Sequence, residues 1–324
     1  MTGSSLGLPG VFGKHPSRGD FLASGNRAPE FTSLDAFLTH NIEWAEAQGR
    51  PDWVQAYNSG SVQAFVHRAN PQRGGTALVG VLAPSWDRAG RRFPLTVGVP
   101  LRASTALSAS PEVLPIVLES CWQAASDLLL SFTSEISARV EVGHEPLCDP
   151  ELDLGNACEG YASWTRTMPS RELWGLIFGE GSPVDPVRVL SVVGRAIATC
   201  RGVEAPTTSL ALRLPLGAAG GAALCFWLDL VSRVARWKAT IPSFFWSHNG
   251  QEGSAVIALG NHPVCTLSEV WDPTGQRDPI CDVATAPWHL MPLDSAEPMV
   301  QALAQLHEQA TIAEVLHAAH CAAY

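Results

Sequence analysis

Two short segments contain the residues of this sequence that could do chemistry or bind a partner. Residues 13–21 read GKHPSRGDF and residues 80–95 read GVLAPSWDRAGRRFPL. Each combines glycine, proline and charged side chains before an aromatic residue, which is typical of a rigid, exposed loop that leads into a buried element. The candidate residues are Lys14, Arg18, Asp20, Phe21, Asp87, Arg88, Arg91 and Phe93.

The charges of the two segments suit pairing between them, because arginine binds carboxylates through two parallel hydrogen bonds. One interpretation is an ion-pair network that braces two neighbouring loops. The other is a rigid polar face presented to a partner, with Phe21 and Phe93 as anchors beneath it. The two interpretations are compatible with each other.

The residues form no complete catalytic or metal-binding motif. A phosphate-binding loop would need glycine and a hydroxyl residue where the chain has Leu8 and His15, and no G-x-S-x-G nucleophile motif occurs. We therefore expect no enzymatic activity, no metal and no cofactor. The alternative is an enzyme that acts on a phosphorylated partner, with Asp20, Asp87 and the arginines placed around a phosphoryl group.

The elements around these segments are predicted from hydrophobic spacing and from glycine and proline positions. Residues 29–48 predict an amphipathic helix, 61–67 and 76–83 a β-hairpin, and 93–99 a third strand. Residues 111–132 predict a helix with Ser110 as its N-cap. The Gly- and Pro-rich stretch 143–160 is the expected linker between an N-terminal domain, 1–142, and a C-terminal domain, 161–324.

The second half alternates predicted helices and strands in blocks. Helices are expected at 186–200, 231–238, 293–309 and 311–323, strands at 209–214 and 222–229, and a hairpin at 244–246 and 255–259. Without a regular βαβ rhythm, this order favours an α+β fold with antiparallel sheets flanked by helices in a two-part chain.

The composition narrows the classes of partner. The 324 residues carry a net charge of −10 and no long run of basic residues, which opposes binding to nucleic acid. Only 16% of residues are charged, so we expect a partly apolar surface and protein partners. The eight cysteines show no paired spacing, and the sequence shows no secretory signal or membrane span, so a cytoplasmic protein with reduced thiols is expected.

Both segments resemble the motifs of the TagF (ImpM) family of type VI secretion system proteins, GKxPxRGDF and GVLxPSxDxxGRxFPL. Between them, Asp35, Trp53 and Tyr57 match a family helix and its aromatic pair, and residues 242–247 give a weaker match near the C-terminal end. The matching residues are Gly13, Lys14, Pro16, Arg18, Gly19, Asp20 and Phe21, then Gly80, Val81, Leu82, Pro84, Ser85, Asp87, Gly90, Arg91, Phe93, Pro94 and Leu95.

The resemblance implies an accessory protein of a bacterial type VI secretion system. Such a protein would repress secretion after translation by binding a forkhead-associated-domain scaffold protein of the apparatus. The charged loops would then form or brace the docking face. A purely structural adaptor of the same system is a further alternative.

Overall fold

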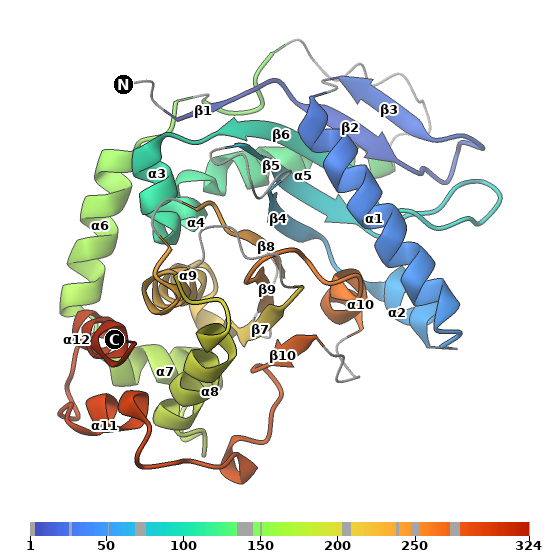
Figure 1. Ribbon diagram of the computed structural model, residues 1–324. Coiled ribbons are helices and arrows are strands. Elements are labelled where there is room, and N and C mark those ends of the chain that lie inside the picture. Colours follow the sequence, from blue (N-terminus) through green and yellow to red (C-terminus); the bar gives the residue numbers. More distant parts are fainter. Residues whose placement is uncertain are drawn as a thin grey trace.

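Ten strands form one open, mostly antiparallel sheet in the computed structural model, which describes residues 4–25, 28–50, 52–68, 76–134, 145–149, 151–202, 209–237, 240–247, 253–272 and 279–323. The order along the sheet is β10-β7-β9-β8-β4-β5-β6-β2-β3, with β1 paired to β6, and helices cover both of its faces (Figure 1). The predicted α+β class with an antiparallel sheet is confirmed. The strands are β1 (Ser5–Leu6), β2 (Gly10–Gly13), β3 (Leu22–Gly25), β4 (Gln63–His67), β5 (Thr76–Ala83), β6 (Leu95–Arg102), β7 (Ala211–Pro215), β8 (Ser243–Ser247), β9 (Ser254–Ala258) and β10 (Ile280–Asp282).

The helices lie in three groups along the chain. The first group is α1 (Pro29–Ala47), α2 (Trp53–Ser59), α3 (Thr105–Ala109), the 3-10 turn η1 (Pro111–Val113), α4 (Leu114–Val117) and α5 (Glu119–Ser134). The second is α6 (Leu154–Thr167), α7 (Ser170–Phe178), α8 (Pro186–Ala198), η2 (Gly217–Ala219) and α9 (Gly221–Ala235). The third is α10 (Thr266–Trp271), η3 (Trp288–Leu290), α11 (Pro298–Ala304) and α12 (Ile312–Ala322).

Alternation along the central strands creates two separate apolar layers. In β5, Val79 and Val81 face the larger core, whereas Leu78 and Leu82 face the smaller one, as expected for side chains that point to opposite faces of a sheet. Helices α1, α2 and α10 cover the smaller core, and α5 packs on β5 and β6 from the other side (Figure 1).

The sheet joins the two halves of the chain. Strand β4 pairs antiparallel with β8, so that Phe65 lies opposite Phe245. The larger core also combines side chains from both halves, for example Val97 and Trp227. Residues on either side of the expected linker 143–160 therefore share one sheet and one core, and α6 begins within that stretch, at Leu154.

One prediction of strand is wrong. Residues 222–229 form the first half of α9, which continues to Ala235 and also includes most of the short helix expected at 231–238. This helix is buried around its whole circumference in its central part, so its sequence lacks the polar stripe that marks a surface helix. A continuous apolar run of this length does not distinguish a buried strand from a buried helix.

The helix expected at 111–132 is divided into η1, α4 and α5. Pro115 has no N–H to donate to the carbonyl of Pro111, and its ring crowds that carbonyl, which accounts for the change between η1 and α4. Ser110 makes no side-chain capping bond, whereas Ser104 caps α3 by accepting from the backbone N–H of Leu107 at 3.2 Å.

Several other predictions hold apart from their ends. The hairpin β4–β5, the helices α1 and α8, and the hairpin β8–β9 occupy the expected stretches, although residues 248–252 at the second turn lie outside the described residues. The expected strand 93–99 begins at Leu95, and the expected helix 293–309 is limited to α11, which starts at Pro298.

Among the described residues, no single helix has the length and apolar character needed to cross a membrane. The segments Pro111–Val117 and Glu119–Phe132 pass this test only as a pair, with a bend of 51° between them.

Candidate docking site at two charged loops

Two loops meet at one end of the sheet, where β2 ends and β6 begins. The first loop, residues 14–21, joins β2 to β3, and the second loop, residues 84–94, joins β5 to β6. Gly13 makes this approach possible. Its φ is +131°, and a Cβ atom there would lie 2.1 Å from the carbonyl oxygen of Pro94. A side chain at position 13 would therefore separate the two loops.

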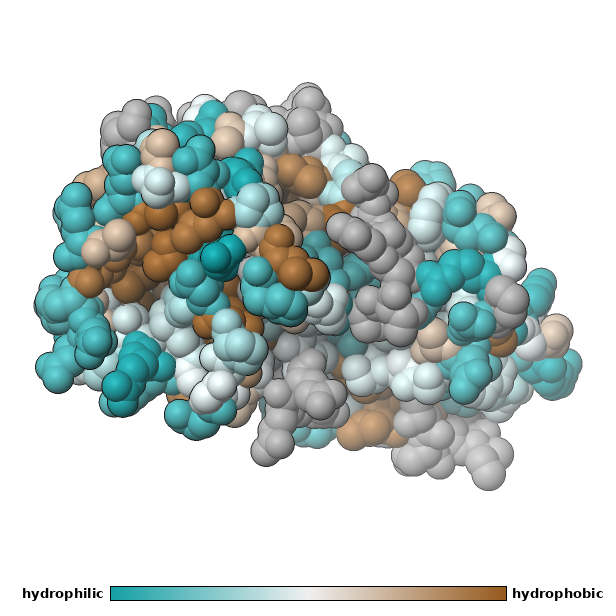
Figure 2. Space-filling view, turned by 90° about the horizontal axis from the view of Figure 1, so that it is seen from below, coloured by the Kyte–Doolittle hydropathy of each residue, from teal (hydrophilic) through white to brown (hydrophobic). Residues whose placement is uncertain are grey.

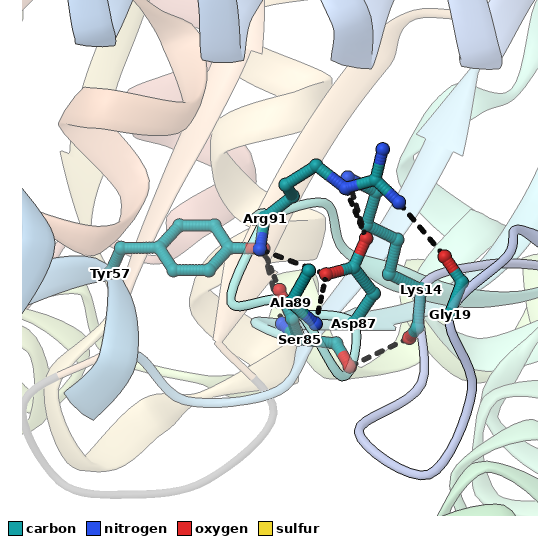
Figure 3. Close-up of polar contacts among 7 residues, drawn as sticks. All are labelled: Lys14, Gly19, Tyr57, Ser85, Asp87, Ala89 and Arg91. Carbon is teal, nitrogen blue, oxygen red and sulfur yellow. Dashed lines mark hydrogen bonds and ion pairs between the residues drawn. The ribbon is translucent and has the colours of Figure 1, made fainter.

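The Asp87 carboxylate is the centre of the polar contacts and is only 1% exposed. Its Oδ1 accepts from the backbone N–H groups of Ala89 and Arg91 at 2.9 and 3.0 Å. Its Oδ2 accepts from Arg91 Nε at 2.7 Å and lies 3.4 Å from Lys14 Nζ (Figure 3). Burial by itself raises the pKa of Asp87, but the hydrogen bonds from Arg91 and Ala89 and the charge of Lys14 outweigh it and hold the pKa at about 2.

Three hydrogen bonds fasten the second loop to the backbone of the first. Ser85 Oγ donates to the Lys14 carbonyl at 2.7 Å, and Arg91 Nη2 donates to the Gly19 carbonyl at 2.8 Å. The backbone N–H of Arg88 donates to the Arg18 carbonyl at 2.7 Å. Because these bonds use backbone acceptors, they fix the path of the first loop whatever its outward side chains are.

Each loop is also held by a helix. The hydroxyl of Tyr57, which is fully buried on α2, donates to the Ser85 carbonyl at 2.9 Å and accepts from the Ser85 N–H at 3.1 Å (Figure 3). On the opposite side of the sheet, His15 Nε2 lies 2.8 Å from the Phe132 carbonyl near the end of α5. The pair of loops is thus connected to both helical layers.

The outer surface of the loops is mixed aromatic and charged. Phe21 is 44% exposed, and the inner side of its ring packs against buried Phe93, with ring centroids 4.9 Å apart in an edge-on arrangement. Trp86 is 39% exposed on the second loop. Asp20 and Arg88 are exposed beside these aromatic residues.

The structure separates the eight predicted site residues into three groups. Lys14, Asp87 and Arg91 form the shared ion-pair network. Phe93 lies beneath Phe21, and Arg18 contributes its carbonyl group to the contact between the loops. The remaining two, Asp20 and Arg88, form no ion pair with other described residues.

Sequence reasoning did not assign roles at this site to His15, Ser85 or Trp86. The hydrogen bond from Ser85 to the Lys14 carbonyl joins residues 71 positions apart. Two features of the sequence could have indicated these residues: the proline that precedes Ser85, and the place of Trp86 next to the charged residues Asp87 and Arg88.

The carboxylates do not converge on an open site. Asp87 is enclosed by its own donors, and Asp20 lies on the outside of the first loop. Throughout the described ranges, no group of three or more His, Cys, Asp or Glu side chains could hold a metal ion.

Two cavities lie away from the loops. One, of about 650 Å³, is lined by aromatic residues that include Trp122, Tyr161 and Trp164. The other, of about 630 Å³, lies between α7, α8 and α11 and includes Trp174 and Phe178. Figure 2 views the molecule from the side of these helices and shows apolar side chains bordered by polar ones. Neither cavity includes a residue of the two loops.

The chain is an α+β protein in which two charged loops are braced at one end of a mostly antiparallel sheet. Residues 10–142 match the family described as the TagF N-terminal domain, type VI secretion system-associated. Residues 10–142 of the chain therefore carry a TagF N-terminal domain. The resemblance predicted from the two motifs is confirmed.

One solved structure with similarity to this chain is the crystal structure of PA0076 from Pseudomonas aeruginosa PAO1. It is 20% identical, the alignment covers 84% of this chain and 97% of that one, and the TM-score is 0.46. No curated protein matches the sequence significantly.

Proposed function

We propose that this protein is a cytoplasmic, post-translational negative regulator of a type VI secretion system, and that it acts by binding a forkhead-associated-domain scaffold protein of the apparatus. In this proposal it is not an enzyme. The docking face is the outer surface of the two loops, formed by Phe21, Trp86, Asp20 and Arg88.

The proposal rests on one observation: within the loops, some side chains fix the backbone and others are exposed to solvent. Asp87, Arg91 and Lys14 hold the backbone in place, while large aromatic and charged side chains next to them remain exposed. A face that is ordered before binding loses less conformational entropy when a partner docks. Exposed aromatic residues and arginine are also the side chains that contribute most to protein–protein binding.

Binding of the purified scaffold protein from the same secretion system tests this face. We expect Phe21→Ala and Arg88→Ala each to weaken binding by at least about tenfold, which corresponds to about 1.4 kcal/mol. Leu176→Ala on α7 is a matched control, because Leu176 is 43% exposed and lies outside the loops. Arg166→Ala on α6 is the corresponding control for charge. Unchanged affinity in folded Phe21 and Arg88 variants would refute the docking face.

A secretion assay separates a regulator from an adaptor. Overproduction of the wild-type protein in its parent bacterium is expected to reduce type VI secretion, and the Phe21 and Arg88 variants are expected to lose this effect at equal abundance. Secretion that is insensitive to overproduction would favour the structural adaptor.

A further inference from the structure

We call the cavity of about 650 Å³ the aromatic cavity, because two pairs of aromatic rings line it. Helix α6 provides Tyr161 and Trp164, whose ring centroids are 5.7 Å apart. Trp122 on α5 and Trp246 on β8 form the second pair, in an edge-on arrangement at 5.5 Å. Trp164 is the more accessible ring of the α6 pair, since Tyr161 is buried and its hydroxyl donates to Asp229 at 3.0 Å.

We propose that the aromatic cavity binds a small organic cation, with an ammonium head against Trp164 and beside the Glu119 carboxylate and an apolar body against Ile116. The volume lies within the range of about 300–1,000 Å³ that is usual for small-molecule sites. The described residues that line the cavity include none from the two loops, so the site does not depend on the function proposed for them.

The aromatic faces favour a positive charge. A cation over the face of a tryptophan or tyrosine ring is attracted by the negative charge of that face, and tryptophan attracts it most strongly. The neighbouring wall is apolar and includes Ile116, which is 42% exposed, and buried Leu216. This combination suits a ligand that has one charged end and one apolar end.

The carboxylates near the cavity also favour a cation. Glu119 is exposed in the first turn of α5, lines the cavity and forms no ion pair with other described residues. Asp229 is paired with Arg233, and burial and the charge of Asp229 raise the pKa of Glu112 to about 7. Burial raises the pKa of Cys225 in the cavity wall, and the negative charges of all three carboxylates raise it further. Glu119 is therefore the full negative charge that a ligand in the cavity would meet at neutral pH.

One feature of the cavity opposes a cation. Helix α9 begins beside it at Gly221 and Ala222, and a helix N-terminus carries a partial positive charge of about half a unit. The full charge of Glu119 is larger, and the described residues that line the cavity include no basic side chain. The balance favours a cation over an anion, and an anionic probe tests this balance directly.

Isothermal titration calorimetry of the full chain with three compounds of one skeleton tests the sign of the charge. The compounds are phenylpropylammonium, the neutral phenylpropanol and the anionic phenylpropanoate, all at neutral pH. We expect the ammonium compound to bind at one site per chain and at least about fivefold more tightly than the alcohol, which is the usual size of a cation–π contact. The carboxylate compound is expected to bind more weakly than the alcohol.

Two variants test the groups that would hold the ammonium head. Glu119→Gln removes the charge of an exposed side chain and should weaken binding of the ammonium compound by about threefold, as for one exposed ion pair, without changing binding of the alcohol. Trp164→Leu removes the aromatic face and should weaken binding of the ammonium compound more than binding of the alcohol. Glu172→Gln is the matched control, because Glu172 is also exposed in the first turn of a helix, α7, but lies outside the cavity.

The cavity between α7, α8 and α11 also combines aromatic rings with a carboxylate, Glu180, so Glu180→Gln shows which cavity holds the ligand. The proposal is overturned if the ammonium compound does not bind, if the alcohol or the carboxylate compound binds as tightly, or if Glu180→Gln weakens binding and Glu119→Gln does not. The comparison of the three compounds on the wild-type protein decides the sign of the charge even if Trp164→Leu folds poorly.

Discussion

The hydroxyl of Tyr57 offers a stringent test of how the second loop is held. Tyr57→Phe removes one oxygen atom and keeps the ring, which packs against Trp53 and Trp271 at centroid distances of 5.5 and 5.1 Å. The substitution therefore changes polar contacts while leaving the apolar packing of the smaller core in place. Burial raises the pKa of Tyr57, so the hydroxyl is neutral at every pH at which the protein would be studied.

The expected loss of unfolding free energy follows from the two backbone groups of Ser85, its carbonyl and its N–H, that lose the Tyr57 hydroxyl as a partner. The Ser85 carbonyl also accepts from the N–H of Phe93 at 3.0 Å and keeps that bond, whereas the Ser85 N–H donates to Tyr57. A buried backbone donor left without a partner costs about 1–3 kcal/mol. We therefore expect Tyr57→Phe to lower the free energy of unfolding by about 2 kcal/mol, with most of the loss caused by one N–H group.

Urea denaturation followed by tryptophan fluorescence measures this difference, provided that the slope of the unfolding free energy against urea is unchanged. Ser59→Ala is the control, because its hydroxyl donates to the Gln55 carbonyl on the exposed side of the same helix. That variant should stay within about 0.5 kcal/mol of the wild type. A loss below about 0.5 kcal/mol for Tyr57→Phe would show that the Ser85 N–H is satisfied in another way and would contradict this prediction.

Three further predictions concern the sheet and its buried charges. Because the folded-state pKa of Asp87 is about 2, below its ordinary value of 3.8, its stabilising effect is fully present above about pH 5 and is lost as the pH falls towards 2. The stability difference between wild type and Asp87→Asn, measured by urea titrations from pH 6 to 3, should therefore shrink at the acid end, and a constant difference would contradict this. Gly13→Ala should destabilise the fold by more than about 1 kcal/mol, because φ at Gly13 is positive and the added Cβ would meet the backbone of Pro94. Gly160→Ala should not destabilise it, because a Cβ at Gly160 would point into open space. Equal melting temperatures for the two variants would count against the close approach of the loops. Burial lowers the pKa of His67 to about 4, so unfolding takes up a proton and the free energy of unfolding falls as the pH drops from about 6.5 to 4. His67→Gln should flatten this dependence of stability on pH, whereas His40→Gln, at an exposed position, should leave it unchanged. An unaltered pH dependence in the His67 variant would show that His67 is not its source.

Local sequence patterns were sufficient to predict a helix or strand where one face of the element is apolar and the other is polar. The spacing of Phe31, Leu34 and Leu38 predicts α1, and these residues are the ones buried in the smaller core. Patterning failed at α9, where burial on all sides removes the polar stripe, and at residues 111–134, where Pro115 interrupts one apolar stretch. The pairing of β4 with β8 joins residues about 180 positions apart, and no local pattern contains that information.

The sequence alone determined the composition of the two loops and their family resemblance, because these depend only on the identity and spacing of residues. It also indicated that charges of both signs would lie near each other. The tertiary structure decided which charges are structural. Asp87 is enclosed because β2 and β6 are neighbours in the sheet. This pairing brings Lys14 close to the Asp87 carboxylate and brings the Gly19 carbonyl within hydrogen-bond distance of Arg91. The same packing leaves Phe21 and Arg88 at the surface, since exposure depends on the elements that surround a side chain and not on its neighbours in the chain.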